Sequence, residues 1–198
     1  MALGAFVRPV QFGVRSEAWS EREEKMTTTR VFRCEDLLKF NNVNLDALTE
    51  TYNMSFYYFY LSKFPEYFKA EVHPSGRLMG YIMGKAEGEG SLWHGHVTAV
   101  TVAPEFRLRG LARKLMASLE STSENVFDAF FVDLFVRVSN TVAITMYEKI
   151  GYSVYRRVIG YYAGEEDAFD MRKALKRDTH KKSIVPLTHP VMPHEVEW

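Results

Sequence analysis

The part of the chain that follows residue 92 alternates strand-like runs with helix-like segments, and this order limits the possible folds more than any other feature. Residues 93–102 are rich in β-branched and aromatic side chains and end at Ala103-Pro104, as a central strand would. Further strand-like runs lie at 130–136, 152–159 and 169–173, with a hairpin turn around Gly164. Between them, apolar residues recur with helical spacing at Leu111, Leu115, Met116 and Leu119, and at Ala143, Met146, Tyr147 and Ile150. This alternation predicts an α/β fold.

The preceding part of the chain contains shorter elements. We expect strands at residues 30–33, 68–72 and 78–84, and a turn at 87–90. An amphipathic segment is expected over residues 34–40, with Leu37, Leu38 and Phe40 as its apolar positions. Short helices or turns rich in aromatic side chains are expected at 45–52 and 56–64.

Composition excludes several classes of protein. A chain of 198 residues suits one domain. Its 25 basic and 25 acidic side chains cancel, which argues against direct binding to nucleic acid or an anionic membrane. Cys34 is the single cysteine, so neither a disulfide framework nor a cysteine-rich metal site is possible. No apolar run approaches the roughly 20 residues of a membrane-spanning helix. We expect a soluble, intracellular protein.

The two ends differ in composition from the middle. Residues 1–25 are expected to form a disordered extension; an organellar presequence and an initiation site at Met26 remain alternatives. The predicted catalytic domain spans residues 26–176. Residues 177–198 hold three prolines and three histidines, so we expect an extended tail. These histidines lack the close spacing of metal ligands. They are His180, His189 and His194.

A basic loop between a strand and a helix is the most informative local feature. The strand ends at Pro104, and the chain turns through Arg107, Arg109 and Gly110 into the next helix. Free backbone N–H groups at a helix N-terminus form an anion site, and glycine lets a phosphate approach the backbone. The loop contains neither a Walker A motif nor GxGxxG. Taken alone, an ordinary turn with solvated arginines explains it equally well.

The loop resembles the acetyl-CoA signature of the GNAT acetyltransferases. Its pattern is Arg107-x-x-Gly110-x-Ala112, preceded by a strand. A second block, Asn140-x-x-Ala143-x-x-x-Tyr147-x-x-x-Gly151-Tyr152, is similar to another motif of that family. The resemblance implies a GNAT fold, a mixed sheet of about seven strands flanked by about four helices. It also implies that acetyl-CoA is bound by Thr101, Val102, Ala103, Arg107, Leu108, Arg109, Gly110, Leu111, Ala112 and Asn140.

From Met26 to about Glu195 the chain further resembles the catalytic subunits of NatB-type N-terminal acetyltransferases. The segments that carry this likeness are 40–46, 48–52, 93–98, 132–140 and 170–173. The resemblance implies acetylation of nascent chains that begin Met-Asp, Met-Glu, Met-Asn or Met-Gln. It also implies a large auxiliary subunit of TPR-like repeats that docks the enzyme on the ribosome, and hence a cytoplasmic, ribosome-associated location.

Transfer from a thioester to an amine needs an uncharged amine and a proton for the leaving thiolate. An α-amino group has a pKa of about 7.7–8.0, so a modest base or a water chain suffices. Tyr147 is the expected acid, because a phenol suits the thiolate and the family has a tyrosine at this motif position. A core aromatic is the alternative for Tyr147. His96 is expected to act as the base or to bind substrate; the alternative is a structural histidine.

His94 and His96 share one face of a strand and suggest a metal pair. We expect no metal, on the argument that no carboxylate or cysteine completes the site.

Substrate selectivity is expected from two segments that flank the peptide entrance in the family. Glu50 and Tyr52 represent the first, and Tyr161 and Tyr162, on a late hairpin, the second. Plain edge aromatics are the alternative for the tyrosine pair. His96, Thr98 and Asn140 are expected to hydrogen-bond the second substrate residue, since Asp, Glu, Asn and Gln each offer a carbonyl-type oxygen.

Two other functions remain open from the sequence: acetylation of lysine or small amines, and a silent acyl-CoA-binding scaffold. The single Cys34 favours direct transfer without a cysteine acyl-enzyme. The aromatic run 56–61 exceeds what a short surface helix requires, which indicates either a partner interface or completion of the core.

Overall fold

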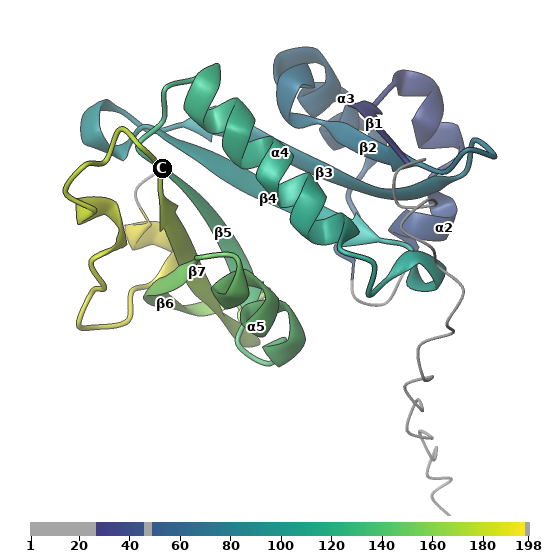
Figure 1. Cartoon of the computed structure of the whole chain (residues 1–198). Helices are drawn as coiled ribbons and strands as arrows, with labels where there is room; N and C mark the ends of the chain where they lie inside the picture. The colour runs from purple at the N-terminus through teal and green to yellow at the C-terminus, as the bar shows by residue number, and fades with distance from the viewer. Residues whose placement is uncertain (1–26, 46–48, 197–198) are drawn as a thin grey trace, which may run out of the picture.

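A computed structural model describes residues 27–45 and 49–196 of the chain. Seven strands form one mixed sheet in the order β1-β2-β3-β4-β5-β7-β6 (Figure 1). Neighbouring strands are antiparallel except for β4 and β5, which run parallel. The predicted mixed sheet of seven strands is therefore confirmed. The strands are β1 (Thr28–Val31), β2 (Lys69–Val72), β3 (Leu78–Glu87), β4 (His94–Val102), β5 (Phe131–Arg137), β6 (Ser153–Tyr162) and β7 (Glu166–Ala174).

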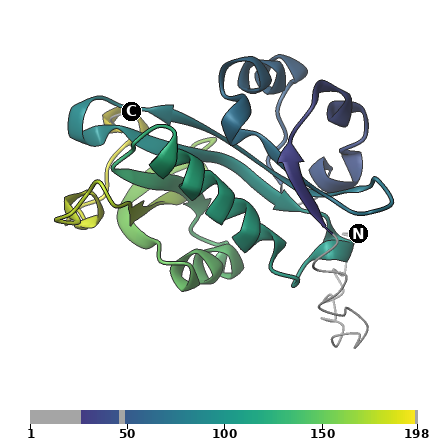
Figure 2. The same cartoon turned by 45° about the horizontal axis from the view of Figure 1, so that its top comes forward.

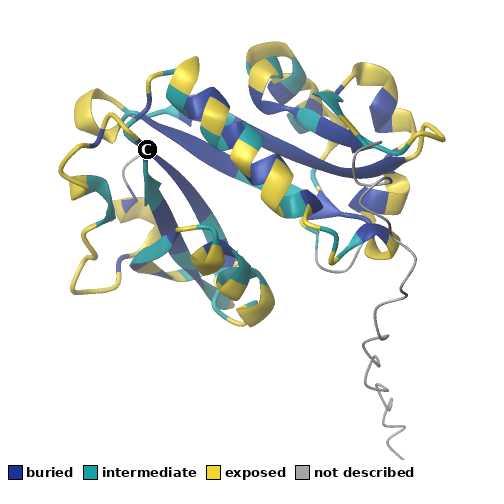
Figure 3. Ribbon diagram, in the orientation of Figure 1, coloured by how far each residue is buried: buried dark blue, intermediate teal, exposed yellow. Residues whose placement is uncertain are grey.

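Four α-helices accompany the sheet: α2 (Asn41–Asn44), α3 (Met54–Lys63), α4 (Leu111–Asn125) and α5 (Thr141–Lys149). The long helix α4 lies across the sheet in both views of the fold (Figures 1 and 2). Its buried face packs with α5 and β5 in one apolar cluster, while α2 and α3 belong to a second cluster with β2 and β3. Figure 3 shows the resulting pattern of buried strands and helices with exposed outer faces.

Local signals explain where the helices begin and end. Asn53 caps α3 by accepting a hydrogen bond from the N–H of Phe56 at 2.9 Å, and Asn140 caps α5 through the N–H of Ala143 at 3.1 Å. Helix α5 ends before Gly151, whose φ of 98° is one that glycine adopts without strain. The predicted stop at Gly151 is confirmed.

Several boundaries differ from the expected ones. Residues 34–40 form a 3₁₀ helix, Cys34–Leu38, followed by α2; Leu37 and Phe40 are buried, but Leu38 is 83% exposed. Glu87 belongs to β3 and not to the turn, because the strand continues three residues beyond Gly84. Among the described residues of 45–52 there is no helix beyond Asn44, and residues 46–48 lie outside the described part.

The pairing of β4 with β5 is short. It covers His94–Val97 of β4 against Phe131–Leu134 of β5, and the remaining residues of both strands are unpaired with each other. On the other side of β4, the register with β3 shifts so that Met83 faces Ala99 and Gly84 faces Val97. Thr98 is therefore an extra, bulged residue. Beyond Val97, the sheet opens between its two central strands.

The tail packs against β6. Val191 exchanges two backbone hydrogen bonds with this strand, at 2.9 Å to Ile159 and 2.9 Å to Arg157. Val191 and Val196 are buried with Val158 in a small cluster. The Pro/His segment is thus extended in part and docked, while its histidines His180, His189 and His194 are exposed. The extension predicted over residues 1–25 lies outside the described residues. Within the described ranges, no helix has the length and apolarity of a membrane span.

Candidate active site

The basic loop folds into a tight strand-to-helix connection. A 3₁₀ turn at Pro104–Phe106 follows β4, and Gly110 precedes α4 with a φ of 78°. The first helical bond of α4 runs from the N–H of Lys114 to the carbonyl of Gly110 at 3.0 Å. The N–H groups of Leu111, Ala112 and Arg113 therefore have no acceptor within the helix, which is the property of an anion site.

The arginines of this loop also shape it. The Nε of Arg107 donates to the carbonyl of Val102 at 3.0 Å, which ties the loop to the end of β4. Arg109 lies over the ring of buried Phe106, 5.5 Å from its centre. Leu108 is 86% exposed with a φ of 61°, so its contribution to a ligand is its backbone and not its side chain. Arg107 and Arg109 thus place positive charge beside the helix terminus.

The edge of β4 that faces β5 has no paired strand over Thr98–Val102 in the described sheet. Its backbone groups at Thr101, Val102 and Ala103 lie directly before the loop, where an extended ligand arm would complete the pairing. The hydroxyl of Thr101 forms a hydrogen bond of 2.6 Å with that of Thr49. An extended ligand could therefore pair with this free edge of β4, on the side of β5, and reach the anion site at its end.

Tyr147 lies on the buried face of α5, 6.0 Å from the ring of Tyr152. Burial raises the pKa of Tyr147 to about 12. Its phenol is therefore protonated throughout the neutral range and can donate a proton.

His96 faces Asp133 across the paired part of β4 and β5. Its Nδ1 lies 2.8 Å from Oδ1 of Asp133, and both residues are buried. Burial alone would raise the pKa of Asp133, but the neighbouring His96 and His94 outweigh it and hold the pKa at about 2. The carboxylate is thus ionised, and the imidazole is held in one orientation.

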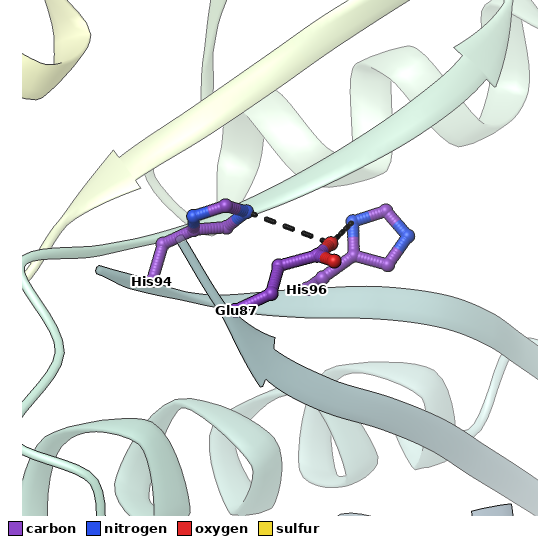
Figure 4. A group of neighbouring side chains, drawn as sticks. All are labelled: Glu87, His94 and His96. Atoms are coloured by element: carbon purple, nitrogen blue, oxygen red, sulfur yellow. Dashed lines mark ion pairs between the residues drawn. The ribbon is translucent and has the colours of Figure 1, made fainter. Parts of the chain in front are cut away.

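The argument that no carboxylate completes the histidine pair is wrong. Glu87, His94 and His96 each bring a possible ligand atom within 4.8 Å of the others (Figure 4). However, Nδ1 of His96 is already bonded to Asp133, while Lys85 pairs with the other carboxylate oxygen of Glu87. Because the ring nitrogen of His96 that faces the cluster is engaged, Glu87 and His94 remain as two ligands, fewer than a protein metal site uses, and we assign no metal to the cluster.

Tyr147 and His96 belong to opposite faces of the sheet. Val132 and Leu134 of β5 pack with Tyr147 in the cluster under α4 and α5. Side chains alternate along a strand, so Asp133 and its partner His96 lie on the other face.

The segments that flank the predicted peptide entrance are joined to β5. Arg137, the last residue of β5, donates to Glu50 at 2.7 Å and to Glu166 of β7 at 3.0 Å, and it lies 4.0 Å from the ring centre of Tyr162. Tyr161 stacks on Phe135 with ring centres 4.6 Å apart. Burial is the main cause that raises the pKa of Tyr161 to about 12.

Tyr52 and Thr98 meet at the bulge of β4. The hydroxyl of Tyr52 lies 3.5 Å from the carbonyl of Thr98, and the hydroxyl of Thr98 donates to that of Tyr60 at 2.9 Å. Burial raises the pKa of Tyr52 to about 12. Asn140 uses its Oδ1 to cap α5, so its amide N–H groups are the donors it offers to a ligand.

Sequence reasoning missed Asp133, Arg137 and Glu87 as parts of the site. The sequence does contain a signal for two of them: Asp133 interrupts the otherwise apolar run 130–136, and Arg137 follows directly at its end. A buried charge of this kind needs a partner. The partners lie 37 and 87 residues away along the chain, so only the folded structure identifies them.

Comparison with known proteins agrees with this geometry. The model of the acetyltransferase (GNAT) family matches residues 34–152. The chain is 62% identical over 173 residues to the N-terminal acetyltransferase B complex catalytic subunit NAA20 of Arabidopsis thaliana, with 87% of this chain and 99% of that protein covered.

Two solved structures are similar as well. Naa20 of Chaetomium thermophilum in complex with a bisubstrate analogue has a TM-score of 0.79 and 44% identity, covering 84% of this chain and 97% of that one. A chain of the NatB acetyltransferase complex bound to CoA and MES has a TM-score of 0.70 and 49% identity, covering 75% and 99%. The sheet, the loop and the relatives together define the chain as an acetyltransferase with the GNAT fold. Within that class, the chain belongs to the family of NatB catalytic subunits.

Proposed function

We propose that this enzyme transfers the acetyl group of acetyl-CoA to the α-amino group of proteins that begin Met-Asp, Met-Glu, Met-Asn or Met-Gln. The observation that carries the proposal is the opening between β4 and β5, which begins one residue pair beyond His96 and follows β4 toward the anion site at the start of α4. A NatB complex bound to CoA and a Naa20 bound to a bisubstrate analogue support the same assignment.

We assign the cofactor to the opening and the loop. The N–H groups of Leu111 and Ala112, with Arg107 and Arg109 beside them, suit the pyrophosphate of CoA. Gly110 lets the phosphate approach the backbone. The exposed edge of Thr101, Val102 and Ala103 suits the amide groups of the pantetheine arm. Asn140 offers its amide N–H groups from the start of α5.

Transfer is proposed to be direct. The nitrogen of the α-amine forms a bond to the acetyl carbonyl carbon, and the bond from that carbon to sulfur breaks. His96, or a water that it binds, takes the proton of the amine, and the phenol of Tyr147 supplies a proton to the thiolate. Cys34, the single cysteine, is exposed next to β1, three strands from β4 in the sheet order, so an acyl-cysteine has no place in the scheme.

Selectivity is proposed to arise on the face that carries His96. Asn140 offers N–H donors, and Thr98 a hydroxyl, toward the oxygen that Asp, Glu, Asn and Gln have in common, whereas the N–H of His96 is taken by Asp133 and this residue is assigned to the role of base. Tyr161 and Tyr162 on one side, and Glu50 and Tyr52 on the other, are proposed to enclose the initiator methionine. A site that encloses the end of a chain in this way would not admit the side chain of a lysine on a folded surface.

An auxiliary subunit is proposed as the partner. Tyr57 and Tyr60 of α3 complete the core, but Tyr58 and Phe59 remain 49% exposed on its outer face. Large exposed aromatic side chains of this kind are enriched at interfaces. We further propose that the partner consists of TPR-like repeats and places this cytoplasmic enzyme on the ribosome, since the chain itself carries no net charge to hold RNA.

Acetylation of matched peptides tests the proposal. The purified complex is offered peptides that differ only in their first two residues, Met-Asp, Met-Asn and Ser-Ala, and a Met-Asp peptide with a blocked α-amine and an internal lysine. Met-Asp and Met-Asn should be acetylated at least about tenfold faster than Ser-Ala, a difference of about 1.4 kcal/mol. Equal rates on Met-Asp and Ser-Ala, or transfer to the lysine of the blocked peptide, would overturn it.

A further inference from the structure

Asp133 and His96 are opposite each other at the end of the β4–β5 ladder. His96 pairs in register with Asp133, one residue before the last pair, Val97 with Leu134. Both side chains lie on the face of the sheet away from α4. His96 is 8% exposed and Asp133 is 3% exposed. The contact joins the two strands at the point where they separate.

The direction of this hydrogen bond follows from the charge of Asp133. Its pKa of about 2 leaves the carboxylate ionised in the neutral range, and an ionised carboxylate only accepts hydrogen bonds. Nδ1 of His96, 2.8 Å away, therefore carries the hydrogen. The second ring nitrogen points away from Glu87 and His94, as Figure 4 shows. In a neutral imidazole, Nε2 consequently carries the lone pair.

The groups around Asp133 and His96 also favour an ionised Asp133 and a hydrogen on Nδ1 of His96. Nε2 of His94 lies 3.5 Å from Asp133, and Nδ1 of His94 is bonded to the carbonyl of Leu92 at 2.6 Å. Glu87 stands 3.9 Å from Nδ1 of His96, so a second acidic oxygen also favours a hydrogen on this nitrogen. Arg172 bonds to Asp170 and adds positive charge near Asp133.

We propose that Asp133 is a positioning residue that holds His96 in the Nδ1–H form and directs Nε2 to the substrate. The inference rests on the proposed role of His96. A neutral imidazole in this form receives the proton of the amine on Nε2 while nitrogen bonds to the acetyl carbon and the carbon–sulfur bond breaks. Without Asp133, Nδ1–H loses its acceptor at 2.8 Å and keeps only the more distant Glu87, so the other tautomer, in which Nε2 carries the hydrogen and has no lone pair to accept a proton, becomes favoured.

Two substitutions of Asp133 separate this role from simple packing. Asp133→Val suits a strand but removes the acceptor, whereas Asp133→Asn keeps an oxygen that accepts from Nδ1–H but adds an amide donor that can bond the other tautomer. Turnover with saturating acetyl-CoA and a Met-Asp peptide should fall at least roughly tenfold in Asp133→Val, up to the roughly 10²–10⁴-fold of a complete general-base loss. Asp133→Asn should lie between it and the unaltered protein.

The tautomer is read independently by ¹⁵N NMR of the histidine side chains. The unaltered complex should show a protonated Nδ1 at His96, and Asp133→Val should show a protonated Nε2. Glu71→Gln is the matched control, because it removes another buried carboxylate of the same sheet, on β2, whose partner is Lys114 and not a residue of the Asp133–His96 pair. This control should leave the His96 tautomer unchanged.

Distinct results identify which idea fails. If His96→Ala keeps full turnover, the proposed role of His96 is wrong whatever Asp133 does. If His96→Ala loses turnover but Asp133→Val keeps both turnover and the Nδ1–H form, only the inference about Asp133 is wrong. A loss in Asp133→Val without a change of tautomer would also overturn it.

Discussion

Arg137 donates two hydrogen bonds to one carboxylate oxygen of Glu50, at 2.7 Å from Nη2 and 3.1 Å from Nε. The same guanidinium bonds to Glu166 and lies over the ring of Tyr162. One side chain at the end of β5 thus fixes both sides of the proposed peptide entrance relative to each other.

Arg137→Ala should weaken peptide binding without changing cofactor binding. Because both members of the ion pair are partly exposed, its loss should lower the free energy of unfolding by less than about 1 kcal/mol. The KM for a Met-Asp peptide should rise several-fold, whereas that for acetyl-CoA should not change. Arg157→Ala, which breaks the exposed Arg157–Asp167 pair next to the same hairpin, is the control. Equal effects of the two substitutions would contradict this role.

Tyr147→Phe should reduce turnover while leaving acetyl-CoA affinity intact. Loss of a general acid costs about 10²–10⁴ in kcat. Tyr152→Phe makes the same change in the neighbouring buried ring, 6.0 Å away, and should keep kcat within a factor of about two. Since burial raises the pKa of Tyr147 to about 12, the pH–rate profile should show no loss from this phenol between pH 6 and about 10. A Tyr147→Phe enzyme with unchanged kcat would exclude this acid.

Gly110→Ala should weaken binding of CoA more than it weakens the fold. A φ of 78° costs a residue with a Cβ roughly 1–2 kcal/mol, and the methyl group would occupy the approach to the backbone. The dissociation constant of CoA should rise about tenfold in calorimetric titration, equivalent to about 1.4 kcal/mol. Gly76→Ala imposes the same backbone strain, at a φ of 84°, in a turn with open space around it. If Gly76→Ala weakens CoA binding equally, backbone strain alone explains the effect.

Acid should destabilise the protein partly through Asp36. Burial of Asp36 would raise its pKa, but hydrogen bonds from Arg30 and from the N–H of Arg33 outweigh burial and lower it. A carboxyl whose pKa is lower in the folded state stabilises the fold above its unfolded pKa of about 3.9 and loses this contribution as the pH falls further. Asp36→Asn should therefore be less stable at pH 6 and less sensitive to acid below pH 4 in urea unfolding. Glu35→Gln, at an exposed ion pair, should follow the unaltered protein.

The order of elements could be predicted from the sequence because each relies on local signals. Helical spacing located α4 and α5, and the asparagine and glycine at the ends of α5 cap it as expected. The 3₁₀ helix at Cys34–Leu38 was not predictable in this way, since its tighter winding turns Leu38 to solvent although the residue pattern suits an amphipathic helix. Glu87 was assigned to a turn because a charged residue beside glycines resembles one, but its pairing with His94 extends β3.

Residues of the candidate site could be predicted from the sequence only where they lie within a known motif. The loop and Tyr147 lie within such motifs; the structure places the loop at the N-terminus of α4 and Tyr147 on the buried face of α5, and their roles stay predictions. Asp133 and Arg137 depend on partners brought together by strand register and by the length of the β4–β5 ladder. Register of this kind depends on tertiary packing and has no signal in a short stretch of sequence.

The ladder of four residue pairs between β4 and β5 is the whole strand pairing between β1–β4 and β5–β7–β6 in the described sheet, and His96 and Asp133 lie inside it. Tyr147 follows β5 and belongs to the second half of the sheet. A rotation of one half against the other would therefore change the distance from the proposed acid to the edge of β4, whereas the contact that orients the proposed base would keep its length.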